Sequence, residues 1–164
     1  MDDSEGKIKS VLNSLEDPGQ AGRGMVVFRY KKPEMQRRRA IVPFCKSDII
    51  TAGVQVIREG GETNLHSHAA MDGFWFVLKG KAKFYGDGDR LEAELGPLEG
   101  VFVPRNTKYW FESSGSEDLE LLQVEAMVKG ADNKRTDHRA KRADAALPEL
   151  FKPDGADYFD KSGA

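Results

Sequence analysis

The chain has 164 residues, 39% of them hydrophobic and 32% charged, so it can form one domain with short extensions. Its net charge of −2 argues against nucleic-acid and anionic-membrane partners, and its single cysteine, Cys45, excludes an internal disulfide and a cysteine-rich zinc site. The N-terminus lacks a signal-peptide pattern, and no apolar run approaches the roughly 20 residues of a membrane span. We therefore expect a cytoplasmic protein.

Residues 1–24 predict a short helical extension. Ser4 is a suitable N-cap, and Asp17-Pro18-Gly19 ends the segment. Apolar residues recur between them at helical spacing: Ile8, Val11, Leu12 and Leu15.

Residues 25–128 predict an all-β domain. Short apolar or alternating runs, separated by turn signals, lie at 25–30, 40–44, 49–58, 74–78, 82–85, 90–95, 100–103, 108–112 and 119–127. About eight short strands with little helix between them favour a sandwich or jelly-roll barrel over an α/β fold. The basic run Arg37-Arg38-Arg39 predicts a solvated face.

Residues 129–164 predict a partly helical tail that packs on the barrel. The stretch 129–146 is rich in charge and alanine, as in a surface helix, and Pro148, Pro153 and Gly155 then interrupt regular structure. Apolar residues near the end could attach the tail to the barrel: Leu147, Leu150, Phe151, Tyr158 and Phe159.

The segment 60–68 is the most informative part of the chain. It contains two of the three histidines, His66 and His68, spaced so that both imidazoles project from one face of an extended strand. Asp72 follows closely. Two imidazoles and a carboxylate form a site for a divalent first-row metal that leaves coordination positions open.

This segment resembles the first motif of the cupin superfamily, whose members are small RmlC-like jelly-roll barrels. The motif has a glycine, five residues, His-x-His, three or four residues, an acid, six residues and a glycine. Gly60, His66, His68 and Gly80 match it. The resemblance implies a cupin-type double-stranded β-helix over residues 25–128. It also implies a homodimer, since cupin barrels commonly pair.

The chain departs from the cupin pattern at two positions. Counting back from Gly80 puts the motif's acid at Gly73, whereas counting forward from His68 puts it at Asp72. In the second motif, Pro104-Arg105-Asn106 forms the turn, and Tyr109 occupies the usual position of the last histidine ligand. Tyrosine can ligate iron, donate a hydrogen bond or simply pack.

Tyr109, Gln123 and Glu62 are further candidates for contact with a substrate. Gln123 lies on one strand face with Leu121 and Glu125, so it is an internal polar group if that face points inward. Glu62 lies an even number of residues before His66 and would share its face in an unbroken strand. Trp75 and Phe111 are expected as apolar walls.

The resemblance implies a divalent metal (Fe, Mn, Ni or Zn) bound by His66, His68 and Asp72. Such a centre would act on a small organic molecule, as a dioxygenase-like enzyme or as a Lewis acid in isomerase or lyase chemistry. Two alternatives remain open. One is a non-catalytic module that binds or senses a small ligand. The other is a metal-free sugar isomerase or epimerase with a histidine as base and Tyr109 as acid.

Overall fold

The computed structural model describes residues 25, 28–140 and 148–151, and these form an all-β fold. The strands, in chain order, are β1 (Arg39–Lys46), β2 (Ile50–Ile57), β3 (His66–His68), β4 (Met71–Lys79), β5 (Ala82–Tyr85), β6 (Leu91–Leu95), β7 (Gly100–Val103), β8 (Trp110–Ser113), β9 (Leu119–Met127), β10 (Arg135–Asp137) and β11 (Glu149–Leu150), with a 3₁₀ turn, η2 (Asp87–Asp89), before β6.

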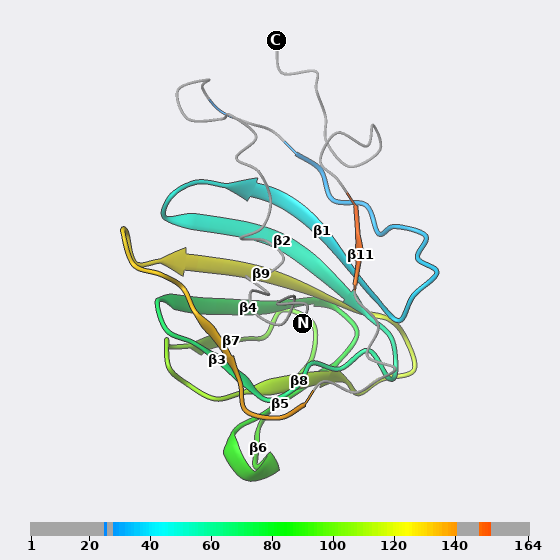
Figure 1. The fold of residues 1–164 in the computed structure, drawn as a ribbon. Coiled ribbons are helices and arrows are strands. Elements are labelled where there is room, and N and C mark those ends of the chain that lie inside the picture. The colour runs from blue at the N-terminus through cyan, green and yellow to red at the C-terminus, as the bar shows by residue number, and fades with distance from the viewer. Residues whose placement is uncertain (1–24, 26–27, 141–147, 152–164) are drawn as a thin grey trace, which may run out of the picture.

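Two layers of strands enclose the core. One layer is a six-stranded sheet of order β11-β1-β2-β9-β4-β7, and the other combines the three-stranded sheet β6-β5-β8 with the pair β10-β3. Figure 1 shows the large sheet curving over the smaller strands. This arrangement is the expected jelly-roll barrel.

Alternation along the strands determines which side chains face the interior of the barrel. In β4, Gly73, Trp75 and Val77 are buried on the inner face, whereas Phe74 and Leu78 are exposed on the outer one. Along β9, the buried inner residues change from leucines at one end to Gln123 and Glu125 at the other. The interior therefore has an apolar end and a polar end.

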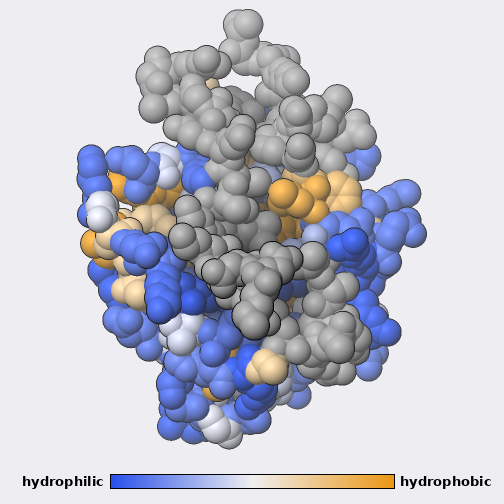
Figure 2. Space-filling model, viewed as in Figure 1, coloured by the Kyte–Doolittle hydropathy of each residue, from blue (hydrophilic) through white to orange (hydrophobic). Residues whose placement is uncertain are grey.

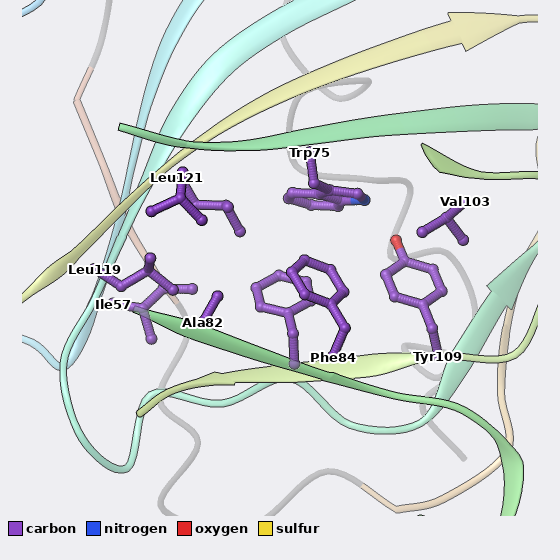
Figure 3. Packing of buried hydrophobic residues seen from close by; sticks show 10 residues of the cluster. Ile57, Trp75, Ala82, Phe84, Val103, Tyr109, Leu119 and Leu121 are labelled. Atoms are coloured by element: carbon purple, nitrogen blue, oxygen red, sulfur yellow. The ribbon is translucent and has the colours of Figure 1, made fainter. Parts of the chain in front are cut away.

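Aromatic and aliphatic side chains fill the apolar end of the barrel (Figure 3). The Trp75 ring lies 4.8 Å from Phe111, and Phe84 stacks on Phe111 at 5.0 Å. This packing confirms the interior positions expected for Trp75 and Phe111. A second cluster covers the outer face of β1 and β2, where Phe28 stacks on Phe44 and Phe151 packs alongside.

Gly80 ends β4 in a conformation that requires glycine. Its φ is 80°, in the left-handed region, and a Cβ there would lie 2.8 Å from the carbonyl oxygen of Asp118. The motif glycine is therefore explained by the tight approach of the β4–β5 turn to the start of β9.

The terminal segments differ in part from expectation. No helix occurs within residues 129–140; this stretch contains β10, which pairs antiparallel with β3. Pairing satisfies backbone groups of β3 that an isolated surface helix would leave open. Residues 28–30 form no strand, and β11 pairs parallel with β1. The helix expected at 4–16 lies outside the described residues, as does the stretch 141–147.

The outer face of β4 and β7 exposes two large aromatic side chains, Phe74 at 44% and Phe102 at 61%. Elsewhere, the described surface in Figure 2 is mostly hydrophilic, with hydrophobic atoms in small patches. No helix among the described residues is long and apolar enough to span a membrane.

The expected homodimer stays a prediction, and the exposed face of β4 and β7 allows a test. If a second copy covers this face, the native protein should sediment as a dimer at micromolar concentration, and Phe102→Asp should sediment as a monomer, because the charge would be buried at the contact. Analytical ultracentrifugation makes the comparison. A native monomer would contradict the prediction.

Candidate functional site

The two histidines of β3 lie side by side in the barrel interior. His66 is 3% exposed and His68 is 5% exposed, with their ring centroids 5.2 Å apart and their planes perpendicular. Nδ1 of His66 lies 2.6 Å from the Asn64 carbonyl oxygen. A carbonyl only accepts, so Nδ1 carries the proton and the neutral ring presents an unprotonated Nε2.

Backbone pairing on both sides fixes β3. On one side Arg135 of β10 is the register partner of His68. On the other side His66 and Tyr109 exchange backbone hydrogen bonds of 3.1 and 2.9 Å, and Asn106 donates its N–H to the His68 carbonyl at 2.7 Å. Asn106 has a φ of 64°, the left-handed conformation expected at the glycine position of the turn.

Burial keeps both imidazoles neutral. Desolvation, followed by repulsion from the Arg135 charge, lowers the pKa of His68 to about 4. The pKa of His66 is also well below its usual value, first through burial and then through Arg135, with a smaller contribution from Arg39. The histidines are therefore hydrogen-bonding groups and potential bases at neutral pH.

Tyr109 joins the histidines. Its ring centroid lies 4.5 Å from that of His66, and its hydroxyl is directed toward Trp75 in Figure 3. Burial, and then the nearby charge of Glu125, raises the pKa of Tyr109 above its ordinary range. The side chain is therefore a neutral phenol, able to donate a proton but poorly suited to ligate a metal as phenolate.

A relay of hydrogen bonds crosses the inner faces of β1, β2 and β9. Arg39 Nε donates to Gln55 Oε1 at 2.9 Å, and Gln55 Nε2 donates to Gln123 Oε1 at 2.6 Å. Gln123 Nε2 then donates to Glu125, whose other oxygen accepts from Thr51 Oγ1 at 3.0 Å. The two amides thus connect a guanidinium to a carboxylate without an ion pair, and we call these five residues the glutamine relay.

Asp72 does not join the histidines. It lies on the outer face of β4, where Arg105 binds both of its oxygens, at 3.0 Å from Nε and 2.7 Å from a terminal nitrogen. These hydrogen bonds lower the pKa of Asp72. The inner position belongs to Gly73, so the structure separates the expected third ligand from the histidines by one residue of register.

The remaining candidates have different positions. Gln123 points inward, which is the alternative that makes it an internal polar group, but both ends of its amide are engaged in the glutamine relay. Glu62 is partly buried in the loop between β2 and β3, and its charge is not among those that shift the pKa of His66 or His68. The expected strand alternation does not reach Glu62, because the strand begins only at His66.

The donor set does not fit a tightly held divalent metal. Within the described ranges, no group of three His, Cys, Asp or Glu side chains is arranged to hold a metal ion. Asp137 is the register partner of His66, but its carboxylate forms an ion pair with Arg135 at 2.8 Å, and both Glu125 oxygens accept hydrogen bonds. The charges of Arg39 and Arg135, which already depress the pKa of His66, would also repel a cation.

Sequence reasoning missed two cationic residues of the site. Arg39 was expected on a solvated face, but it occupies an inner position of β1 because Ala40, Val42 and Phe44 pack on the outer face. That alternation was the available signal, since it places Arg39 opposite Ala40. Arg135 carried no local signal, because only its long-range pairing with β3 brings it to His68.

The comparisons with known proteins agree with this fold. Residues 53–125 match the family model described as the cupin domain. A double-stranded β-helix protein from Klebsiella pneumoniae superposes with a TM-score of 0.56 at 16% identity, over 66% of this chain and 84% of the other. The comparison with curated proteins found no match.

Two further solved structures are also similar to the chain. The cupin domain of Cnp3 from Schizosaccharomyces pombe has a TM-score of 0.52 at 18% identity, over 58% of this chain and 69% of the other. An RmlC-like cupin from Methanocaldococcus jannaschii has a TM-score of 0.52 at 17% identity, over 62% and 89%. Identities this low speak to the fold alone. Together with the match of residues 53–125 to the cupin-domain model, they show that the barrel has the cupin-type fold.

Proposed function

We propose that this cupin domain binds a small organic molecule at the polar end of its barrel and does so without a resident divalent metal. The observation that carries the proposal is a buried polar group without a partner. Nδ1 of His68 is buried and has no hydrogen-bond partner among the described residues. An unpaired buried polar atom costs free energy, so a bound water or ligand group that pairs with Nδ1 of His68 would stabilise the site.

The surroundings of His68 suit a small, partly apolar ligand. His66 and Tyr109 present a neutral imidazole and a phenol beside it, and Trp75 forms an aromatic wall 6.2 Å from the Tyr109 ring. Polar groups at fixed positions against an apolar wall are typical of ligand sites. In this arrangement the imidazoles recognise hydroxyl or carbonyl groups of the ligand.

A second candidate is a metal-independent enzyme of the isomerase or epimerase type. The contact between His66 and Tyr109 favours this candidate, because their ring centroids lie 4.5 Å apart and a neutral imidazole and a phenol are a potential base and acid. The binding proposal does not require turnover. Incubating a bound sugar or hydroxy acid in deuterated water would separate the two, since only the enzyme would exchange a carbon-bound proton.

Metal content tests the metal-free part of the proposal. Protein purified without an affinity tag and then exposed to Fe(II), Mn(II), Ni(II) or Zn(II) should retain well below one equivalent after dialysis, because two imidazoles alone bind weakly. Elemental analysis of the native protein and of His66→Ala/His68→Ala measures this. One equivalent in the native protein that disappears in the double variant would restore the dioxygenase-like or Lewis-acid interpretation.

Ligand binding can be followed through Trp75. The only other tryptophan is Trp110, which stacks on Tyr85 at 4.1 Å, so Trp110→Phe leaves one reporter inside the barrel. We expect members of a panel of small sugars, hydroxy acids and aromatic acids to change the emission of this variant. The change should weaken when Tyr109→Phe or His68→Ala is added. A panel without any effect would contradict the proposed function.

A further inference from the structure

We infer that the ligand of this barrel carries a carboxylate, and that Arg39 and Arg135 bind it. The inference rests on the proposed function and adds the chemical class of the ligand. It is carried by the positions and hydrogen bonds of the two guanidinium groups, neither of which was expected at the site.

Arg39 is a cation inside the barrel without a carboxylate beside it. The hydrogen bond of its side chain within the described residues runs from Nε to Gln55, and its terminal nitrogens have no hydrogen-bond partner there. Burial is the main cause that lowers the pKa of Arg39 to about 10, and Arg135 is the next. The group stays protonated at neutral pH, so the fold keeps a partly buried positive charge at this position.

The glutamine relay keeps Arg39 positioned without a direct ion pair. Gln55 and Gln123 stand between the guanidinium and Glu125, so the buried carboxylate compensates the charge only at a distance. A direct ion pair would have consumed the fork of donors that arginine offers to a carboxylate. The relay therefore fixes the orientation of Arg39 through Nε and leaves the outer edge of the guanidinium for another partner.

Arg135 supplies a second positive charge from the opposite layer. It lies beside His68 in the β10–β3 register, and its side chain is 14% exposed. Its Nε forms an ion pair with Asp137 at 2.8 Å, and one terminal nitrogen donates to Asn64 at 2.6 Å, so the other terminal nitrogen has no hydrogen-bond partner among the described residues. As the register partner of His68, Arg135 lies on the same inward face as the imidazoles, and Arg39 lies on the inner face of β1 in the other layer.

A small organic carboxylate satisfies these groups better than other ligands. Its two oxygens match the guanidinium fork, and its negative charge relieves the repulsion between Arg39 and Arg135. The rest of the molecule then meets Trp75 and Tyr109, which favour a compact, partly apolar body. Inorganic phosphate carries at least as much negative charge but has no apolar body, so we expect it to bind more weakly.

Matched probes test the inference on the full chain carrying Trp110→Phe. Benzoate and benzamide have nearly the same shape and differ in charge, as do pyruvate and pyruvamide. Titration of Trp110→Phe, followed by Trp75 emission and by calorimetry, should show each acid binding at least roughly 10-fold more tightly than its amide. Added salt should weaken the acids only. Phosphate serves as the inorganic anion.

Arginine variants assign the effect to the proposed residues. Arg39→Gln should reduce benzoate affinity roughly 10- to 100-fold and leave benzamide unchanged, with a smaller loss for Arg135→Gln. Arg39→Lys keeps the charge but loses the fork, so an intermediate loss is expected even if the glutamine variant folds poorly. Arg90→Gln, on the exposed β5–β6 hairpin, is the control and should change nothing.

The outcomes separate this inference from the proposed function. If amides bind as well as acids, or if Arg39 variants weaken both equally, the carboxylate assignment is wrong while ligand binding in the barrel stands. If phosphate binds as tightly as benzoate, the site recognises inorganic anions and the organic assignment fails. If no probe, charged or neutral, affects Trp75, both proposals fail together.

Discussion

Lowering the pH from 7 to 5 is expected to reduce the free energy of unfolding by about 2 kcal/mol through His68 alone, and by about 3 kcal/mol at pH 4. The folded pKa is about 4, against 6.5 for a free histidine. Between these two pH values the imidazole binds a proton in the unfolded chain but not in the folded chain. The contribution of His68 to the free energy of unfolding is therefore present above about pH 6.5 and is lost as the pH falls. His66 acts in the same direction, since burial also lowers its pKa.

Urea denaturation at a series of pH values measures this loss. His68→Gln should remove the part of this loss that His68 contributes, about 2 kcal/mol between pH 7 and 5, and leave the part due to His66, because glutamine keeps a polar side chain but does not titrate. His138→Gln is the control, since His138 is the remaining histidine and is exposed. If the free energy of unfolding of His68→Gln depended on pH as steeply as that of the native protein, the pKa of His68 would not be lowered in the folded state.

Replacing Glu125 by leucine should destabilise the fold by about 2–4 kcal/mol, although leucine has a similar volume. The carboxylate is fully buried and accepts hydrogen bonds from Gln123 and Thr51. Leucine would leave both donors buried without an acceptor, at about 1–3 kcal/mol each. The glutamine relay would also lose the acceptor that orients its amides, so carboxylate binding by Arg39 should weaken.

A double-mutant cycle distinguishes the relay from simple repacking. Thr51→Val removes one of the orphaned donors, so Thr51→Val/Glu125→Leu should be less destabilised than the sum of the two single variants. Equilibrium denaturation of the native protein, the two single variants and the double variant gives the coupling free energy between Thr51 and Glu125. Glu117→Leu is the control for loss of a carboxylate, because Glu117 is 56% exposed and pairs only with Lys79. Additive losses would mean that Thr51 and Glu125 do not act together.

Local patterns predicted the barrel and the histidine pair because both depend on near neighbours in the chain. The alternation of Trp75 and Val77 with exposed Phe74 defines an inner and an outer face, and the i, i+2 spacing of His66 and His68 directs both rings inward. The position of Tyr109 in the second cupin motif makes it a candidate for the cavity, and it is buried beside His66 through their isolated backbone bridge.

Local patterns could not predict which charged residues lie at the site. Asp72 was assigned to the site from sequence spacing alone, and one residue of register sends it outward to Arg105. Arg39 belongs to a basic run that usually indicates solvent, and only the packing of Ala40 on the other face reverses that expectation. Arg135 reaches the site only through the pairing of β10 with β3, two strands far apart in the chain, and local sequence propensity cannot predict that pairing.

Gly73 ties the acid position of the cupin motif to the aromatic wall of the barrel. A Cβ at this position would lie 3.1 Å from the indole nitrogen of Trp75, which is 1% exposed and packed against Phe111. A side chain at residue 73 would therefore need the indole to shift by a few tenths of an ångström within a packed cluster. Adding a carboxylate beside the histidines would thus act on the aromatic wall and on the donor set at the same time.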